Sequence, residues 1–169
     1  MSLTSVCLLD ANLLIALTHS SHVHHAIAQQ WFELARRRQF ATCAVTQLAF
    51  VRLSSNPRVA GTNISPAQAM AALAAWTAHP GHVFWPDILA PVDVPVLNSP
   101  AVVGHRQVTD AYLLGLAGAY KQKLATLDRA LLTFAGATGL ATHLEWIGGP
   151  SVVHEPRAAY GPRPVVRRK

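Results

Sequence analysis

The sequence predicts a single α/β domain with a mostly parallel central sheet flanked by helices, and two observations carry this prediction. Short, continuous apolar runs recur along the chain, and such runs are typical of strands that are covered on both faces. Each of the three clearest runs is followed by a helix-like pattern, and alternating strands and helices form right-handed crossover units. The 169 residues, 51% of them hydrophobic, are also enough to bury one core of ordinary size.

Five segments are candidate strands. The proline-rich stretch 80–100 is expected to be a long irregular connection that contains one of them. Cys7 and Cys43 both fall in candidate strands and have no C-x-x-C spacing, so we expect packed thiols rather than a disulfide or a zinc site. Three of the strands are predicted more strongly (Val6 to Leu9, Phe40 to Val45 and Leu124 to Leu127), and two are weaker (83–85 and 144–146).

Helical periodicity and capping signals predict four helices. Ile27, Trp31 and Leu34 recur at helical spacing within the segment from His24 to Arg38. Ser65-Pro66-Ala67-Gln68 is typical of a capping box with proline at the first helical position. The other three helices are expected from Ser65 to about Ala78, from Thr109 to Tyr120, and from near Arg129 to the glycines at 136 and 139.

Composition and charge indicate where the protein is located in the cell and what kind of partner it binds. No apolar run approaches the roughly 20 residues that a bilayer-spanning helix needs. No signal peptide is expected either, because Asp10 interrupts the first apolar stretch, so we expect a cytoplasmic protein with no membrane association. The net charge of +6 favours a polyanionic partner.

Most of that charge lies in the C-terminal segment. Residues 151–169 contain five basic residues against Glu155, together with several prolines, which predicts an extended basic tail. A solvated tail is favoured there over a phosphate-binding arm. We therefore divide the chain into one domain at residues 1–150 and a basic, proline-containing tail at residues 151–169.

Three aspartates lie where the strands of a parallel sheet would end. Asp10 directly follows the first strand, Asp128 directly follows the strand ending at Leu127, and Asp110 opens the helix expected from Thr109. In open α/β sheets ligands bind beyond the carboxyl ends of the strands, where residues distant in sequence converge. The chain has only eight acidic residues, so the placement of three at one edge is informative.

Each of these aspartates, taken singly, is explained as a helix cap. Taken together, three carboxylates gathered at one place would repel one another and raise one another's pKa unless a cation neutralised them. Hard cations such as Mg²⁺ or Mn²⁺ accept carboxylate oxygens and keep waters for a phosphate substrate. The three aspartates therefore predict a divalent metal site.

Four sequence motifs in order resemble those of VapC-type PIN-domain toxins, the ribonucleases of type II toxin-antitoxin systems. They span residues 6 to about 135. No single motif is specific for the family, but the four motifs in this order and at these separations are strong evidence for it. The motifs are Leu8-Leu9-Asp10-Ala11-Asn12, Thr42-Cys43-Ala44-Val45-Thr46-Gln47 with Phe50-Val51-Arg52, Val108-Thr109-Asp110-Ala111-Tyr112-Leu113-Leu114, and Leu124-Ala125-Thr126-Leu127-Asp128-Arg129.

This resemblance implies a PIN-like fold, Mg²⁺- or Mn²⁺-dependent cleavage of RNA, a cognate antitoxin protein and a homodimer. By match of motif, Asp10, Asp110 and Asp128 take the acidic, metal-binding positions of the family. The resemblance also implies hydrogen-bonding neighbours around these carboxylates, at Asn12, Thr46, Thr109 and Thr126.

One position departs from the family pattern. The second motif normally ends in Thr-Glu, and here it ends in Thr46-Gln47. Glutamine is nearly isosteric with glutamate but carries no charge and cannot act as a base, so a catalytic contribution from Gln47 is in doubt. A weakened toxin is one interpretation, and a catalytically inactive PIN-like module that binds RNA or protein is the alternative.

Other residues carry weaker signals. Arg52 and Arg129 each follow a motif of the predicted site and are candidates for substrate phosphate contacts, although either could simply pair with an aspartate. His22, His24 and His25 do not share a helix face and are expected to be structural or surface residues. Three tryptophans lie in apolar patterns and are expected in the core rather than as platforms for bases, at positions 31, 76 and 146.

Overall fold

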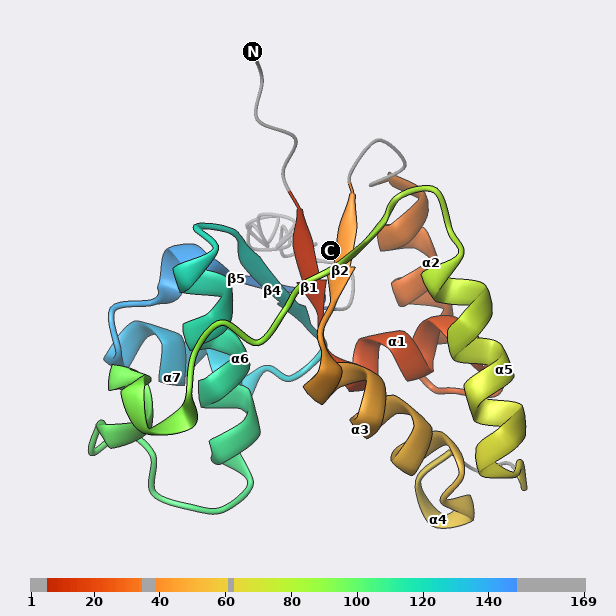
Figure 1. Cartoon of the computed structure of the whole chain (residues 1–169), viewed down its shortest axis with the longest axis horizontal. Helices are drawn as coiled ribbons and strands as arrows, with labels where there is room; N and C mark the ends of the chain where they lie inside the picture. The colour runs from red at the N-terminus through yellow and green to blue at the C-terminus, as the bar shows by residue number, and fades with distance from the viewer. Residues whose placement is uncertain (1–5, 35–38, 61–62, 149–169) are drawn as a thin grey trace, which may run out of the picture.

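The computed structural model describes residues 6–34, 39–60 and 63–148, and within them it confirms the predicted α/β fold. A five-stranded sheet lies between two groups of helices (Figure 1). All four of its strand pairs are parallel. Each of the five predicted strands is present, as β1 (Cys7–Leu9), β2 (Phe40–Thr42), β3 (His82–Phe84), β4 (Lys123–Thr126) and β5 (Leu144–Trp146).

The strand order places a topological switch at the middle of the sheet. The order is β3-β2-β1-β4-β5, so the chain moves outward from β1 in one direction and later returns to β4 on the other side of β1. Leu8 pairs with Leu124 and Leu9 pairs with Ala125, so the carboxyl ends of β1 and β4 lie side by side. Such a switch point is where open parallel sheets bind their ligands.

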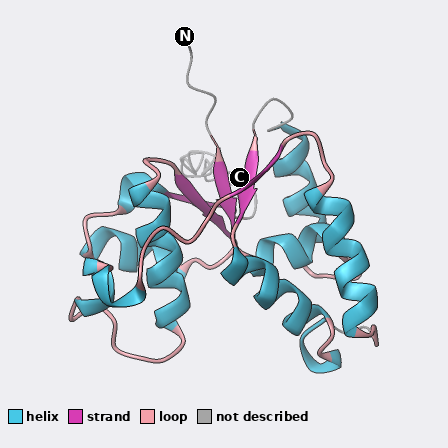
Figure 2. Ribbon diagram, in the orientation of Figure 1, coloured by secondary structure: helices cyan, strands magenta, loops and turns pink. Residues whose placement is uncertain are grey.

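Helices cover both faces of the sheet, as the ribbon diagram shows (Figure 2). The predicted capping box at the start of α5 is confirmed, because Ser65 Oγ accepts a hydrogen bond from Gln68 N and Gln68 Oε1 accepts one from Ser65 N. The helices are α1 (Ala11–Thr18), α2 (His25–Leu34), α3 (Ala44–Ser54), α4 (Pro57–Ala60), α5 (Pro66–Thr77), α6 (Gln107–Ala119) and α7 (Ala130–Ala137), with 3₁₀ turns η1 (Pro91–Asp93), η2 (Pro95–Asn98) and η3 (Ala141–His143).

Alternation along the strands divides the core between the two faces. Leu8 and Leu124 pack in one cluster with side chains of α6, α7 and η2. Leu9 and Phe40 pack in a second cluster with side chains of α1, α2 and α5. Strands that are buried on both faces need continuous apolar sequence, which is why the apolar runs predicted them correctly. Cys7 and Cys43 are buried and are not joined by a disulfide, as predicted.

Several predicted boundaries were wrong. The strands predicted at Leu124–Leu127 and at 83–85 each lie one residue earlier, at Lys123–Thr126 and His82–Phe84. The second strand ends at Thr42 rather than Val45, because α3 already begins at Ala44. The helix expected from Thr109 begins two residues earlier, at Gln107, so Asp110 lies in its first turn rather than at its start. The helix expected from His24 begins at His25, and its described part ends at Leu34.

Two further predictions fall outside the described residues: the continuation of α2 through 35–38, and the basic tail at residues 151–169. Within the described ranges, no helix combines the length and the apolar character needed to cross a bilayer.

Candidate functional site

A buried hydroxyl connects the ends of the two central strands. Thr126 is the last residue of β4, and its Oγ1 donates a hydrogen bond of 2.9 Å to Asp10 Oδ2. The same oxygen accepts a 3.1 Å hydrogen bond from the backbone N of Asp128. Thr126 is fully buried, so this link has little competition from water. It fixes the carboxylate of Asp10 against the loop that carries Asp128, at the switch point of the sheet.

Asp10 is a buried carboxylate with few neutralising partners. It follows β1 directly, and its backbone N donates to Ala125 O of the neighbouring strand. Burial raises its pKa, and the nearby negative charge of Asp128 raises it further, while the Thr126 hydroxyl and the backbone N–H groups of Ala11 and Asn12 act in the opposite direction. The net direction is upward. A carboxylate in this setting gains from a cation beside it.

Asp110 reaches the same place from α6. Partial burial raises the pKa of Asp110 to about 7, and the charges of Asp10 and Asp128 contribute in the same direction. Two carboxylates influence each other's pKa only when they lie close together. The structure therefore brings Asp10, Asp110 and Asp128 into one electrostatic neighbourhood.

Asp128 is the most exposed of the three and also serves as a helix cap. Its Oδ1 accepts a 2.8 Å hydrogen bond from Ala130 N at the start of α7. The helix-cap explanation is thus correct for one oxygen of Asp128. Asp10 precedes α1 without the usual side-chain cap hydrogen bond, although the backbone N–H groups of Ala11 and Asn12 favour its charged form.

The donor set fits a hard divalent cation in its chemistry. All three side chains offer carboxylate oxygens, and the burial that raises the pKa values of Asp10 and Asp110 is a cost that a cation would offset. Among the described residues, however, no group of three or more His, Cys, Asp or Glu side chains is arranged so that it could hold a metal ion as it stands.

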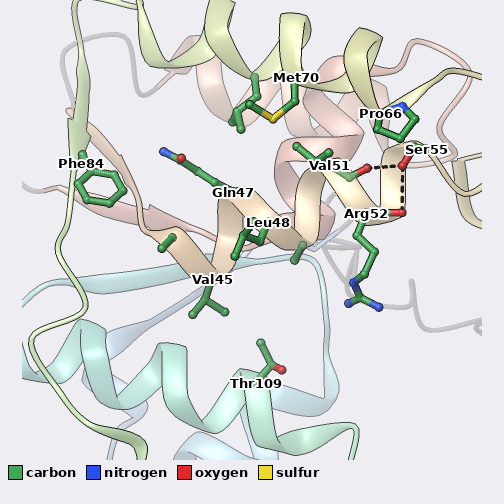
Figure 3. Close-up of a pocket in the computed structure, with 13 residues that line it drawn as sticks. Val45, Gln47, Leu48, Val51, Arg52, Ser55, Pro66, Met70, Phe84 and Thr109 are labelled. Atoms are coloured by element: carbon green, nitrogen blue, oxygen red, sulfur yellow. Dashed lines mark hydrogen bonds between the residues drawn. The ribbon is translucent and has the colours of Figure 1, made fainter.

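Gln47 does not join the carboxylates. Its Nε2 donates a 2.9 Å hydrogen bond to Thr42 Oγ1, which in turn lies 2.7 Å from His82 Nε2. In Figure 3 the Gln47 amide extends from α3 on the side of Phe84, while Thr109, the neighbour of Asp110, lies across the helix beyond Val45. The position where the family pattern has glutamate is therefore tied to β2 and β3 in this chain.

The predicted hydrogen-bonding neighbours divide into two groups. Thr126 contacts two of the aspartate residues directly. Thr46 instead completes the capping of α3, because its Oγ1 accepts from Cys43 N and donates to Cys43 O. Asn12 and Thr109 are exposed in the first turns of α1 and α6, and no hydrogen bond joins either side chain to another described residue.

The two predicted phosphate-binding arginines occupy different surroundings. Arg52 is exposed in the last turn of α3, where its guanidinium extends on the same side of the helix as Thr109 (Figure 3). Arg129 follows Asp128, and its Cζ lies 5.8 Å from the centroid of the Trp146 ring. Within the described chain neither arginine forms an ion pair with an aspartate.

The prediction that all three tryptophans lie in the core was wrong for Trp146. Trp31 and Trp76 pack against the core on the α1, α2 and α5 face, as expected. Trp146 is 37% exposed at the end of β5. The sequence missed this because β5 is an edge strand, whose last residue lies beside the switch point and has no further strand to cover it.

The fold and the site together define a class. A parallel α/β sheet whose switch point gathers three aspartates, contributed by the ends of β1 and β4 and by the first turn of α6, has the architecture of a PIN-like domain.

Comparison with known proteins identifies the family. No family model matches the chain. Ribonuclease VapC39 of Mycobacterium tuberculosis is 45% identical over 135 residues, which cover 77% of this chain and 94% of the relative. Ribonuclease VapC38 of the same species is 43% identical over 130 residues, covering 77% and 90%, and Ribonuclease VapC29 is 44% identical over 129 residues, covering 76% and 90%. The chain belongs to the VapC ribonuclease family.

Proposed function

We propose that this chain is a Mg²⁺- or Mn²⁺-dependent endoribonuclease that hydrolyses RNA phosphodiester bonds as the toxin of a toxin-antitoxin pair. The observation that carries the proposal is the Thr126 link between Asp10 and Asp128, with Asp110 close enough for its pKa to respond to both. The relatives' name, ribonuclease, supports the choice of RNA as the substrate. We further propose that the enzyme acts in the cytoplasm.

Each residue has a distinct role in this proposal. Asp10, Asp110 and Asp128 would hold the cation, and when bound it would neutralise their charge, activate a water for in-line attack and offset the charge on the phosphoryl oxygens. Thr126 donates a hydrogen bond to Asp10 Oδ2 and the backbone N of Ala130 donates one to Asp128 Oδ1, so both carboxylates that would hold the cation are already oriented by the protein. Such outer hydrogen bonds set the orientation of ligating carboxylates.

The first test replaces each aspartate by its uncharged isostere. Asp10→Asn, Asp110→Asn and Asp128→Asn should each lower Mg²⁺-dependent cleavage of a single-stranded RNA by at least about 100-fold, because each removes a charge that holds the ion. Asp93→Asn is the matched control, since Asp93 is an exposed aspartate in η1. Gel-resolved cleavage rates measure the effect. Metal-dependent cleavage that survives in all three variants would disprove the nuclease proposal.

The second test concerns Gln47. We propose that the lost charge at this position weakens metal binding without abolishing it, because a glutamate would add a negative charge, whereas the neutral Gln47 amide is bonded to Thr42. Gln47→Glu should then raise Mg²⁺ affinity, measured by calorimetry, and the cleavage rate, each by about tenfold. Gln30→Glu, an exposed residue of α2, is the control for added charge. If neither quantity rises, the position does not belong to the site.

The antitoxin and the homodimer are also proposals. They are supported by an apolar groove of about 820 Å³ between α3 and α5, whose lining includes Leu48, Met70 and Phe84. These side chains are 72%, 52% and 49% exposed, respectively, and large exposed apolar patches mark protein interaction sites. Light scattering after gel filtration tests the dimer, and inhibition of cleavage by the product of a small open reading frame upstream tests the antitoxin.

A further inference from the structure

Trp146 and Arg129 form a pair next to Asp128, and the proposed chemistry assigns a role to neither of them. Trp146 is the register partner of Thr126, the residue that links Asp10 to Asp128, so its ring belongs to the carboxyl edge of the sheet. Arg129 directly follows Asp128, and its guanidinium carbon lies 5.8 Å from the Trp146 ring centroid, within the range of a cation–π interaction. An aromatic ring and a cation thus lie next to Asp128, at the carboxyl edge of the sheet.

The Trp146 ring is held in place by its surroundings. Its Nε1 donates a 3.3 Å hydrogen bond to Leu127 O in the loop that leads to Asp128. Gly148 lies so close to the ring that a Cβ there would clash with Trp146 Cη2. This position therefore has to be glycine for the ring to lie where it does. A fixed ring is a platform that restricts the flexible arginine side chain.

The orientation of Arg129 is unusual for its setting. Arg129 directly follows Asp128, and an arginine beside a carboxylate commonly pairs with it, because Arg–carboxylate pairs are frequent and bidentate. Here no ion pair joins Arg129 to an acidic side chain in the described part of the chain, and Arg129 is exposed over the Trp146 ring. The guanidinium keeps its donors available for an anion from solution, and its planar fork matches the oxygens of a phosphate.

We propose that Arg129 contacts a phosphate of the RNA next to the cleaved bond, and that Trp146 is the positioning residue that keeps the guanidinium away from the carboxylates. This inference rests on the proposed ribonuclease function. Cleavage needs an anionic strand to approach three carboxylates, and one fixed cation at their border lowers that repulsion. Trp146 contributes by restricting the Arg129 side chain, because a restricted side chain loses less conformational entropy when the phosphate binds.

The experiment uses a fluorescein-labelled single-stranded RNA with the full-length protein. Binding is measured by anisotropy in EDTA over a range of salt concentrations, and KM and kcat are measured in Mg²⁺. Arg129→Ala should raise Kd about tenfold and reduce the salt slope of binding by about one, which is the signature of one lost phosphate contact. Lys121→Gln removes a charge just before β4, at the opposite edge of the sheet, and should change neither quantity.

Variants of Trp146 separate positioning from a structural role. Trp146→Leu should raise Kd and KM about two- to fivefold, the change that an exposed cation–π contact produces, and should leave kcat unchanged. Trp146→Phe keeps an aromatic face and should restore most of the affinity. Combined with Arg129→Ala, Trp146→Leu should add no further loss, because the arginine it positions is absent.

Three results overturn the inference, and they are distinct from failure of the ribonuclease itself. They are unchanged RNA affinity in Arg129→Ala, additive losses in the double variant, and a Trp146→Leu variant whose melting temperature falls while its RNA affinity stays normal. If the wild type binds RNA with the expected Arg129 and Trp146 dependence but does not cleave it in Mg²⁺, the contact site stands and the nuclease proposal fails.

Discussion

At the scale of single residues, Thr126 shows how one hydroxyl can hold a site together. It satisfies a buried carboxylate oxygen of Asp10 and a backbone N–H of Asp128 at once. Because both partners lie at the ends of neighbouring strands, the hydroxyl couples the geometry of the sheet to that of the acidic residues. Leaving either partner unsatisfied when buried is costly, so substitution here affects stability as well as chemistry.

Thr126→Val tests this coupling, since valine keeps the branched shape and removes only the hydroxyl. The unfolding free energy should fall by about 1 to 3 kcal/mol, because a buried carboxylate loses its donor. Mg²⁺ affinity, measured by calorimetry, should fall by about 10- to 100-fold, as is usual when the hydrogen bond to a ligating group is removed. Thr126→Ser keeps the hydroxyl and serves as the control. Normal Mg²⁺ affinity in the valine variant would show that the link is dispensable.

The sequence predicted those residues of the candidate site that lie at the ends of strands, and it did not predict the surroundings of the others. Asp10 directly follows β1 and Asp128 lies two residues beyond the end of β4, so the apolar pattern alone was enough to assign them to one edge of the sheet. The surroundings of Gln47 were not predictable in this way, because its partner Thr42 lies on β2 and that contact depends on how α3 leaves the strand. Trp146 was misplaced because an apolar pattern does not distinguish a central strand from an edge strand.

At the scale of secondary-structure elements, the strands were predicted well and their ends less well. Continuous apolar runs marked β1, β2 and β4, because these strands are covered by helices on both faces, whereas the edge strands β3 and β5 were weaker candidates. The run from Phe40 to Val45 continued past the true end of β2 at Thr42, since Cys43 and Val45 are apolar as well. The start of α3 is set by a local hydrogen bond, in which Cys43 N donates to Thr46 Oγ1. The sequence does not reveal that this hydrogen bond outweighs the β-propensity of the segment.

The packing of α6 against the segment before it makes a sharp prediction about two glycines. A Cβ on Gly115 would lie 2.6 Å from Val94 Cγ1, and Val94 is fully buried and stiff at its branched side chain. Gly115→Ala should therefore destabilise the protein by about 1 to 3 kcal/mol, although alanine is the better helix former.

Gly136, in α7, is the matched control for this substitution. A Cβ there meets nothing within 4 Å, so Gly136→Ala should stabilise the protein by about 0.5 kcal/mol or more. Urea denaturation followed by circular dichroism measures both variants. Stabilisation by both substitutions would mean that η2 moves away from α6 at no cost.

At the scale of the whole molecule, folding collects negative charge that the unfolded chain keeps apart. Asp10 and Asp128 arrive from opposite sides of the switch point, and Asp110 arrives from a helix that packs on one face of the sheet. Repulsion among these three carboxylates therefore destabilises the folded state, and enzymes commonly lose stability at their functional sites in this way. A ligand that binds only the folded state offsets the cost by mass action.

The loss of stability caused by this repulsion can be measured at Asp110. Its pKa in the folded protein is about 7, above the ordinary value of 3.8, so stability falls as the pH rises between these values and the full cost is present at pH 8. At pH 8 in EDTA, Asp110→Asn should raise the melting temperature by about 2 to 4 °C or more, because it removes the buried charge. The Asp93→Asn control should leave it unchanged.

Adding Mg²⁺ should reverse the ranking of the two proteins. The wild type should gain about 2.7 kcal/mol of stability at a Mg²⁺ concentration 100 times its Kd, whereas Asp110→Asn should gain much less because one ligand charge is gone. Differential scanning fluorimetry with and without Mg²⁺ follows both shifts. A variant that is less stable than the wild type in EDTA, or that gains as much from Mg²⁺, would mean that Asp110 supports the fold rather than a cation, and the metal site would have to be sought without it.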